Sequence, residues 1–332
     1  MPDIMELFKK SPDGGKPDHK TDDKSDEQAL ISKAISDLTD LLKANPGNAD
    51  AHHSLGVLFY NRGMIEEAIA ECSTAVRLKP DFLKAYVNLA NAYFNKGLLN
   101  QAIDAYREAL KLGPGRGDLR YSLANACYQA GRSDDAINEY REALRLNPNN
   151  AECHAILAAI YYSKGMAVEA IVAYKESIRI NPLYADAHFN LGVIYSNKNM
   201  PNEAIREYLE VLRINPRHAN THKRLGDIYY GKGMVDDSIR AFREAISVNE
   251  GDAQTHTSLG MALMKKHLLD KAASEFNLAL RITPDNVDAL YNLGNVYARN
   301  GQTSEAIKSY QAAMAANPAY VKGQLEKDTG QS

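Results

Sequence analysis

The sequence predicts an all-α solenoid built from antiparallel helix pairs. Three observations lead to this class: prolines recur every 34 residues, small residues recur at two fixed places in each interval, and apolar residues follow helical spacing on both sides of a central break. The prolines are Pro46, Pro80, Pro114, Pro148, Pro182, Pro216, Pro284 and Pro318, with Glu250 at the one missing step. Since such periods are typical of stacked supersecondary units, chain length here measures the number of units.

The composition excludes several other classes. The chain has 332 residues, of which 45% are apolar and 24% charged, so wholesale disorder, collagen and a membrane-embedded fold are not expected. The net charge of −3 leaves no basic footprint for nucleic acid or an acidic membrane, and partners are expected to be proteins. The start lacks a secretory signal, and the three cysteines have no paired spacing. These features predict a cytoplasmic protein.

At the N-terminal end we expect a tail followed by a lone helix. Residues 1–26 are predicted as a disordered tail, since most of them are polar, proline or glycine. Residues 27–48 are predicted as a capping half-repeat helix, because their register matches the second half of a unit. Four large apolar residues near the start fit a tethered docking segment, a weak membrane contact or a frayed end. They are Ile4, Met5, Leu7 and Phe8.

The middle of the chain is predicted to hold eight units, with positions counted from the first residue of each unit. The units are 49–82, 83–116, 117–150, 151–184, 185–218, 219–252, 253–286 and 287–320. In each unit a first helix, a break at position 15, a second helix and an exit at position 32 follow one another. Position 15 is glycine in six units and Asn199 or His267 in the others, which predicts a left-handed residue that ends the helix. Positions 8 and 20 are small and position 24 is aromatic in seven units, so the two helices are expected to pack closely.

Small residues at 8 and 20, aromatics at 11 and 24 and proline at 32 together resemble the tetratricopeptide repeat. The resemblance covers residues 49–320 and implies a right-handed superhelical solenoid, with positions 2, 5, 9, 12 and 13 facing a concave groove. Asn88, Asn190 and Asn292 at position 6 are similar to the asparagine ladder of O-linked N-acetylglucosamine transferases, but other residues interrupt it and no catalytic domain is expected. Residues 321–332 are predicted as a tail that caps poorly, which leaves the C-terminal face partly open.

The groove positions carry an aromatic and amide pattern that predicts a peptide-binding site. Tyrosine supplies apolar area with a hydrogen-bonding tip, and amide side chains pair with the backbone of an extended peptide. The alternative is that the aromatics only pack between neighbouring first helices. The asparagines favour binding, because asparagine is a poor helix-interior residue unless it bonds something. The predicted partner-binding residues are Tyr60, Asn61, Asn91, Phe94, Asn95, Asn125, Tyr128, Tyr162, Lys223, Asp227, Tyr230, Asn295 and Arg299.

No pattern in the sequence predicts catalysis, a cofactor or a metal. It contains no phosphate loop, nucleophile elbow, metalloprotease helix or dinucleotide fingerprint. Five histidines at position 4 are expected to be half-buried packing groups, since one per hairpin places them roughly 8–10 Å apart. His218 and His222 stand four residues apart, but no third ligand converges on them, so zinc is not expected. Cys72 and Cys127 are expected in the core.

The sequence therefore predicts a non-catalytic protein–protein interaction scaffold, or adaptor, that binds a partner segment in the groove. Two alternatives remain open at this point. One is a substrate-recruiting subunit of a separate transferase. The other is a self-assembling scaffold, a homo-oligomer that stacks through its terminal faces, chiefly the weakly capped C-terminal one.

Overall fold

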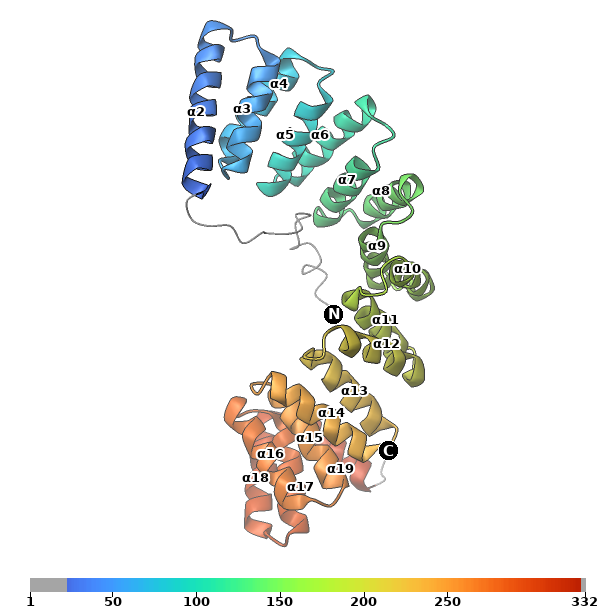
Figure 1. Ribbon diagram of the computed structural model, residues 1–332. Helices are drawn as coiled ribbons and strands as arrows, with labels where there is room; N and C mark the ends of the chain where they lie inside the picture. The colour runs from blue at the N-terminus through green and yellow to red at the C-terminus, as the bar shows by residue number, and fades with distance from the viewer. Residues whose placement is uncertain (1–22, 330–332) are drawn as a thin grey trace. The chain divides into compact units, whose positions relative to one another are not determined.

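A computed structural model describes residues 23–329, which form helices α2 to α19 and contain no strand (Figure 1). The chain divides into two compact units, one ending at Pro182 and one beginning at Leu183, and each is described by itself. We call them the N-terminal unit and the C-terminal unit. Within each, consecutive helices pair as antiparallel hairpins, so the predicted all-α solenoid of helix pairs is confirmed.

Each hairpin joins a first helix of 13 residues to a second helix of 14 residues. The N-terminal unit contains α2 (Asp23–Ala44), α3 (Ala49–Asn61), α4 (Ile65–Leu78), α5 (Leu83–Asn95), α6 (Leu99–Leu112), α7 (Gly117–Gln129), α8 (Ser133–Leu146), α9 (Ala151–Ser163) and α10 (Ala167–Ile180). The C-terminal unit contains α11 (Ala185–Asn197), α12 (Pro201–Ile214), α13 (Ala219–Gly231), α14 (Val235–Val248), α15 (Ala253–Lys265), α16 (Leu269–Ile282), α17 (Val287–Arg299), α18 (Thr303–Ala316) and α19 (Pro318–Thr329). Every pair from α3–α4 to α17–α18 lies inside one of the 34-residue windows proposed from the sequence.

The turn between the two helices of a hairpin is left-handed at position 15, as predicted. The six glycines there have φ angles between 75° and 78°. Asn199 and His267 adopt the same conformation with φ of 55° and 59°. Asparagine and histidine are among the side chains that tolerate this region best, so both turns keep their geometry without glycine.

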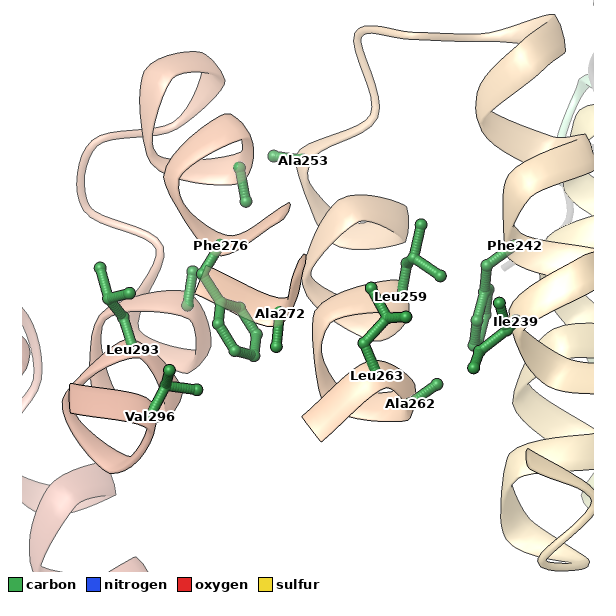
Figure 2. Packing of buried hydrophobic residues seen from close by; sticks show 12 residues of the cluster. Ile239, Phe242, Ala253, Leu259, Ala262, Leu263, Ala272, Phe276, Leu293 and Val296 are labelled. Atoms are coloured by element: carbon green, nitrogen blue, oxygen red, sulfur yellow. The ribbon is translucent and has the colours of Figure 1, made fainter. Parts of the chain in front are cut away.

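In the four hairpins from α11 to α18, glycine at position 8 faces an aromatic ring at position 24. A Cβ on Gly226 would lie 2.5 Å from the Phe242 ring, and one on Gly260 would lie 2.6 Å from the Phe276 ring. Figure 2 shows Phe276 among Ala272, Leu293 and Val296 in the cluster that joins α14 to α17. The absence of a side chain at position 8 therefore lets the ring approach the first helix directly.

Exposed polar contacts join successive hairpins at a fixed spacing of 30 residues. The position-14 lysine of one hairpin reaches position 18 of the hairpin before it, as in Lys96–Glu66 at 3.0 Å and Lys164–Asp134 at 2.6 Å. Lys266 contacts Asp236 in the same way. Each such exposed pair contributes only about 0.2–1 kcal/mol, so the buried interior carries most of the stability.

The first described helix differs from its predicted bounds. α2 begins at Asp23, so four residues assigned to the tail belong to the helix, and it ends at Ala44. It packs on α3, and Arg62 donates to the Ser32 hydroxyl at 2.5 Å. The remainder of the predicted tail, residues 1–22, lies outside the described residues.

The prediction of a polar, poorly capping tail at residues 321–332 is wrong, because α19 covers the last hairpin. Asn317 accepts a hydrogen bond from the Tyr320 amide at 3.0 Å, so Pro318 begins a helix instead of only ending one. Val321 is 2% exposed and packs in a cluster with Tyr291 and Ala313. The last hairpin is therefore covered by α19, contrary to the expectation that its face is left partly open.

Candidate functional site

The structure places the predicted partner-binding residues on first helices of both units. In the N-terminal unit they are Tyr60 and Asn61 on α3, Asn91, Phe94 and Asn95 on α5, Asn125 and Tyr128 on α7, and Tyr162 on α9. We call these the N-terminal first-helix face. In the C-terminal unit they are Lys223, Asp227 and Tyr230 on α13, and Asn295 and Arg299 on α17. We call these the C-terminal first-helix face.

Neighbouring first helices are joined directly on the N-terminal first-helix face. The Asn95 amide donates to the Tyr60 hydroxyl at 2.6 Å, which links the ends of α5 and α3. Two turns further in, the Asn88 amide nitrogen lies 2.8 Å from Nε2 of His53. Burial raises the pKa of Tyr60, against the opposing effect of the Asn95 hydrogen bond. Tyr60 is therefore a neutral hydroxyl at any physiological pH.

The asparagines at position 9 have a structural role that the sequence did not indicate. Asn91 Oδ1 accepts from the Tyr106 hydroxyl at 2.6 Å, and Asn125 Oδ1 accepts from the Tyr140 hydroxyl in the same geometry. Both tyrosines are buried at position 24 of the same hairpin, and burial raises their pKa. Each amide oxygen is therefore committed to the interior, which fixes the orientation of the whole side-chain amide.

The aromatic residues at position 12 are half-buried on the N-terminal first-helix face. They therefore both pack between neighbouring first helices and leave ring area available to a partner, the two roles that the sequence left open. Phe94, Tyr128 and Tyr162 lie on three successive first helices and each keeps part of its ring exposed. Burial raises the pKa of Tyr128. Asn61, at the end of α3, is exposed. The face thus presents apolar rings beside oriented amide donors.

The C-terminal first-helix face is more highly charged. Lys223 pairs with Asp252 at 3.1 Å, and the Lys265 ammonium lies 4.8 Å from the Tyr230 ring centre. Burial opposes ionisation of Asp252, but hydrogen bonds from Thr255 and Lys223 outweigh it and lower its pKa. Lys223 therefore helps to hold the residue that caps the next first helix.

The three remaining residues of this face differ in their contacts. Asp227 is exposed to solvent, yet desolvation by the surrounding helices raises its pKa, while Lys223 and Arg224 act in the opposite direction. Asn295 repeats the position-9 arrangement and accepts from the Tyr310 hydroxyl at 2.7 Å. Arg299 is exposed at the end of α17.

Comparison with protein families decides what this architecture is. Models described as tetratricopeptide repeat match residues 87–151, 185–218, 221–252 and 287–320, and one described as TPR repeat matches residues 58–97, 160–199 and 269–301. The chain belongs to the tetratricopeptide repeat (TPR) family. TPR repeats commonly form protein–protein interaction scaffolds, which is the general role that the family indicates here. A search of the curated proteins finds no match for the chain.

Solved TPR structures match the chain over most of their own length. YrrB, described as a TPR protein with an unusual peptide-binding site, is 26% identical, covers 55% of this chain and 95% of its own, and has a TM-score of 0.50. The C-terminal part of a TPR repeat-containing protein from Cytophaga hutchinsonii is 14% identical, covers 69% of this chain and 95% of its own, and has a TM-score of 0.60. PilF from Pseudomonas aeruginosa is 21% identical, covers 62% and 94%, and has a TM-score of 0.51. The last two show the TPR fold alone.

Three of the five position-4 histidines in the TPR hairpins contact a glutamate at position 23. His256 Nδ1 lies 2.7 Å from Glu275 and its Nε2 lies 3.2 Å from the Glu250 carbonyl oxygen, so both ring nitrogens are used. Arg120 takes the place of histidine beside Glu139, at 2.7 Å. The other two glutamate pairs are His52–Glu71 and His188–Glu207.

A signal for these pairs was present in the sequence but was missed. Position 23 is glutamate in the first, third, fifth and seventh TPR units and alanine or serine in the others, which gives a period of 68 residues. Where alanine stands at position 23, His154 and His222 contact only the carbonyls of Pro148 and Pro216. Position 4 is thus a structural tie between hairpins.

The described part of the TPR array has no group of three or more histidine, cysteine or acidic side chains placed to hold a metal ion. Cys72, Cys127 and Cys153 are buried, unpaired thiols. Nε2 of His222 lies 2.9 Å from the Pro216 carbonyl oxygen, so this nitrogen is already engaged by the backbone. No helix within residues 23–329 is both long and apolar enough to cross a membrane.

His218 makes one TPR hairpin sensitive to acid. Its Nδ1 accepts from the Thr221 amide at 3.3 Å to cap α13, and its ring packs at a tilt of 59° against Phe189, with the ring centres 5.2 Å apart. Burial lowers its pKa, an effect that His222 reinforces and Asp186 opposes. As the pH falls below about 6.5, the unfolded chain takes up the proton first, so the free energy of unfolding decreases.

We expect His218→Asn, which keeps a capping acceptor, to reduce this loss. Urea denaturation at pH 7.5, 6.0 and 5.0, with amide hydrogen exchange of α13, measures how much unfolding free energy each protein loses on acidification. The two proteins should differ least at pH 7.5, and the variant should lose less stability at pH 5.0. Parallel losses in both would contradict the assignment to His218.

Proposed function

We propose that the chain is a non-catalytic TPR scaffold that binds an extended segment of a protein partner along the N-terminal first-helix face. The observation that carries this proposal is the pairing of exposed ring edges with pre-oriented amide donors. Phe94 and Tyr128 offer apolar area, while the Asn91 amide is held by the Tyr106 hydroxyl behind it and the Asn125 amide by the hydroxyls of Tyr140 and Tyr121. A rigid donor loses little side-chain freedom when a peptide carbonyl accepts from it.

The comparison with YrrB supports the same function. YrrB shares the TPR fold at 26% identity and is described as having a peptide-binding site. Side-chain amides that donate to backbone carbonyls recognise the extended main chain of a peptide, whatever its side chains are. The partner class we propose is therefore an extended protein segment with apolar side chains at intervals.

The transferase-subunit alternative has less support. Its basis was the asparagine ladder at position 6, but Asn88 is engaged with His53. Asn292 is 8% exposed and donates to the Asp288 carbonyl at 2.8 Å. Two of the three ladder residues therefore serve the fold. The proposal also includes a reducing, cytoplasmic compartment, because the three cysteines are unpaired thiols.

Binding to an array of 15-residue peptides, followed by fluorescence titration of the selected peptides, tests the proposal. We expect Phe94→Ala with Tyr128→Ala to weaken binding by about tenfold or more, since truncated interface aromatics typically cost at least about 1–2 kcal/mol. Asn125 is left unchanged, because replacing it would deprive the buried Tyr140 hydroxyl of its acceptor.

The matched control is Val168→Ala with Val172→Ala. These two valines are 67% and 58% exposed on α10, a second helix, and lie outside the face. The control should bind as the unchanged chain does. Equal affinity of the face variant and the unchanged chain, or an equal loss in the control, would place the site elsewhere.

A further inference from the structure

The second helix of every TPR hairpin has an inward stripe at positions 23, 24 and 27, whose residues are buried or half-buried. The large residue at position 24 meets position 8 of its own first helix, and the glutamate at position 23 meets position 4. Position 27 is at most 5% exposed in all eight units. Its residues are Ala75, Ala109, Ala143, Ser177, Val211, Ala245, Ala279 and Ala313.

α2 carries the same stripe without a first helix of its own in the described residues. Its register places Asp37, Leu38 and Leu41 at positions 23, 24 and 27. Leu41 is 44% exposed, although every other residue at position 27 is buried, and Asp37 is exposed. Leu30, on the same side of the helix, is 69% exposed. We call Leu30, Asp37, Leu38 and Leu41 the open stripe.

The chain before α2 holds a segment with matching chemistry. The only large apolar residues among residues 1–22, apart from Met1, are Ile4, Met5, Leu7 and Phe8, and two lysines follow them directly. In the hairpins with an acidic residue at position 23, that residue pairs with a histidine or arginine of the first helix. A lysine after Phe8 would give Asp37 the same kind of partner.

The length of the intervening chain permits this contact. Fourteen residues separate Phe8 from Asp23, the first residue of α2, and they span up to about 46–50 Å when extended. Leu41 lies 18 residues along α2, or about 27 Å from its start. The segment therefore reaches every turn of the open stripe.

We propose that residues 4–8 cover the open stripe of α2 within the same chain, in the place of the missing first helix, with Lys9 or Lys10 beside Asp37. A tether of this length gives an effective concentration of about millimolar, well above that of a second copy at micromolar protein. Burying the leucines and the segment's own apolar side chains together stabilises the contact. This surface is separate from the first-helix faces, and it makes the first end of the array self-covered.

Disulfide trapping in the full chain tests the proposal. Phe8→Cys is combined with Leu41→Cys, on the open stripe, or with Ser36→Cys, an exposed residue on the opposite side of α2. Ser36 is nearer to the tether, so the tether alone favours the control pair. The natural cysteines stay unreactive, because burial raises the pKa of Cys72 and Cys153 to about 12 and that of Cys127 to about 11.

At micromolar protein under mild oxidation, we expect the Leu41→Cys pair to form an intrachain disulfide about tenfold faster than the Ser36→Cys pair. Non-reducing electrophoresis and peptide mapping distinguish intrachain from interchain products. An interchain product at Leu41→Cys would overturn the proposal in favour of a second copy as occupant. Equal rates in the two pairs would overturn it in favour of an uncovered stripe.

A second measurement leaves α2 untouched. In the full chain, Leu7→Ser with Phe8→Ser should raise amide hydrogen exchange of residues 29–44 by about tenfold, because the cover is lost. Lys16→Ser, in the intervening chain, should leave that exchange unchanged. Unchanged exchange in the Leu7→Ser, Phe8→Ser variant would overturn the proposal independently of the trapping result.

Discussion

Replacing Phe276 with alanine is expected to lower the free energy of unfolding of the C-terminal unit by about 3–5 kcal/mol. Phe276 is fully buried, and its ring fills the space between Ala272 and the leucines and valine of neighbouring helices (Figure 2). Because a solenoid is held only by contacts between neighbours, the cavity weakens α15, α16 and α17 together. Urea denaturation with amide exchange across residues 183–329 measures the loss.

A second substitution shows whether the contact between the Phe276 ring and Gly260 at position 8 contributes to the stability that Phe276→Ala removes. Gly260→Ala alone places a Cβ 2.6 Å from the Phe276 ring and should cost about 1–3 kcal/mol by overpacking. In the Phe276→Ala background the same change meets no ring, and the higher helix propensity of alanine, about 1 kcal/mol, should make it stabilising. This change of sign is the expected result of the double-mutant cycle. Asn277→Ala, an exposed neighbour, is the control and should change stability little.

Val321→Asp is expected to detach α19 from the last hairpin. Val321 is 2% exposed against Tyr291 and Ala313, and an unpaired carboxylate there would cost several kcal/mol. The helix avoids that cost by leaving the site, so the observed loss is limited to its own docking energy. We expect fast amide exchange in α19, increased exchange in α17 and α18, and self-association by light scattering as the last hairpin is uncovered.

The control for this experiment is Ala319→Asp, an exposed position in the first turn of α19. A carboxylate there interacts favourably with the helix N-terminus, so α19 should stay docked. A Val321→Asp chain with protected α19 amides would show that this helix does not depend on the buried valine. Detachment in both variants would show that any new charge, and not its burial, is responsible.

The sequence predicts the repeated part of the fold well, because local chemistry decides it. Asn199 and His267 replace glycine at position 15, and both adopt the left-handed conformation that their place in the period requires. Gly226 and Gly260 stand where a ring meets the first helix, so the period identifies their packing role as well. The left-handed turn occurs eight times and the contact between glycine and a ring four times, and this repetition separates a structural requirement from chance.

The ends of the array were predicted less well, because they do not repeat. Pro318 was interpreted as the end of a helix, but the preceding asparagine caps a new helix in which proline takes the first position. The amphipathic pattern of α19 depends on Tyr320 and Val321 meeting Tyr291, a contact between residues about 30 apart in the sequence. No local rule shows that such a partner exists.

At the candidate site, the sequence predicted which residues lie on first helices but not what occupies their polar atoms. Asn91 and Asn125 were assigned to partner binding, and the structure shows that each holds a buried tyrosine with its oxygen. The spacing of 15 residues between asparagine and tyrosine marks this pair wherever both occur. It remained hidden because positions 9 and 24 were interpreted separately, one as surface and the other as core.

Each position-9 asparagine lies on the first-helix face and also accepts a hydrogen bond from a tyrosine in the interior. This double role limits which substitutions can change the recognition surface. A substitution that alters what Asn125 recognises also removes the acceptor of Tyr140, so it needs a compensating change in the interior. The sixth hairpin shows that change already made, since Asp227 stands at position 9 where Phe242, with no hydroxyl, stands at position 24. The fourth and fifth hairpins keep Tyr174 and Tyr208 at position 24 with Ala159 and Val193 at position 9, so a tyrosine there does not always require asparagine. In the second, third and eighth hairpins, where asparagine and tyrosine are paired, a change at position 9 also affects the interior.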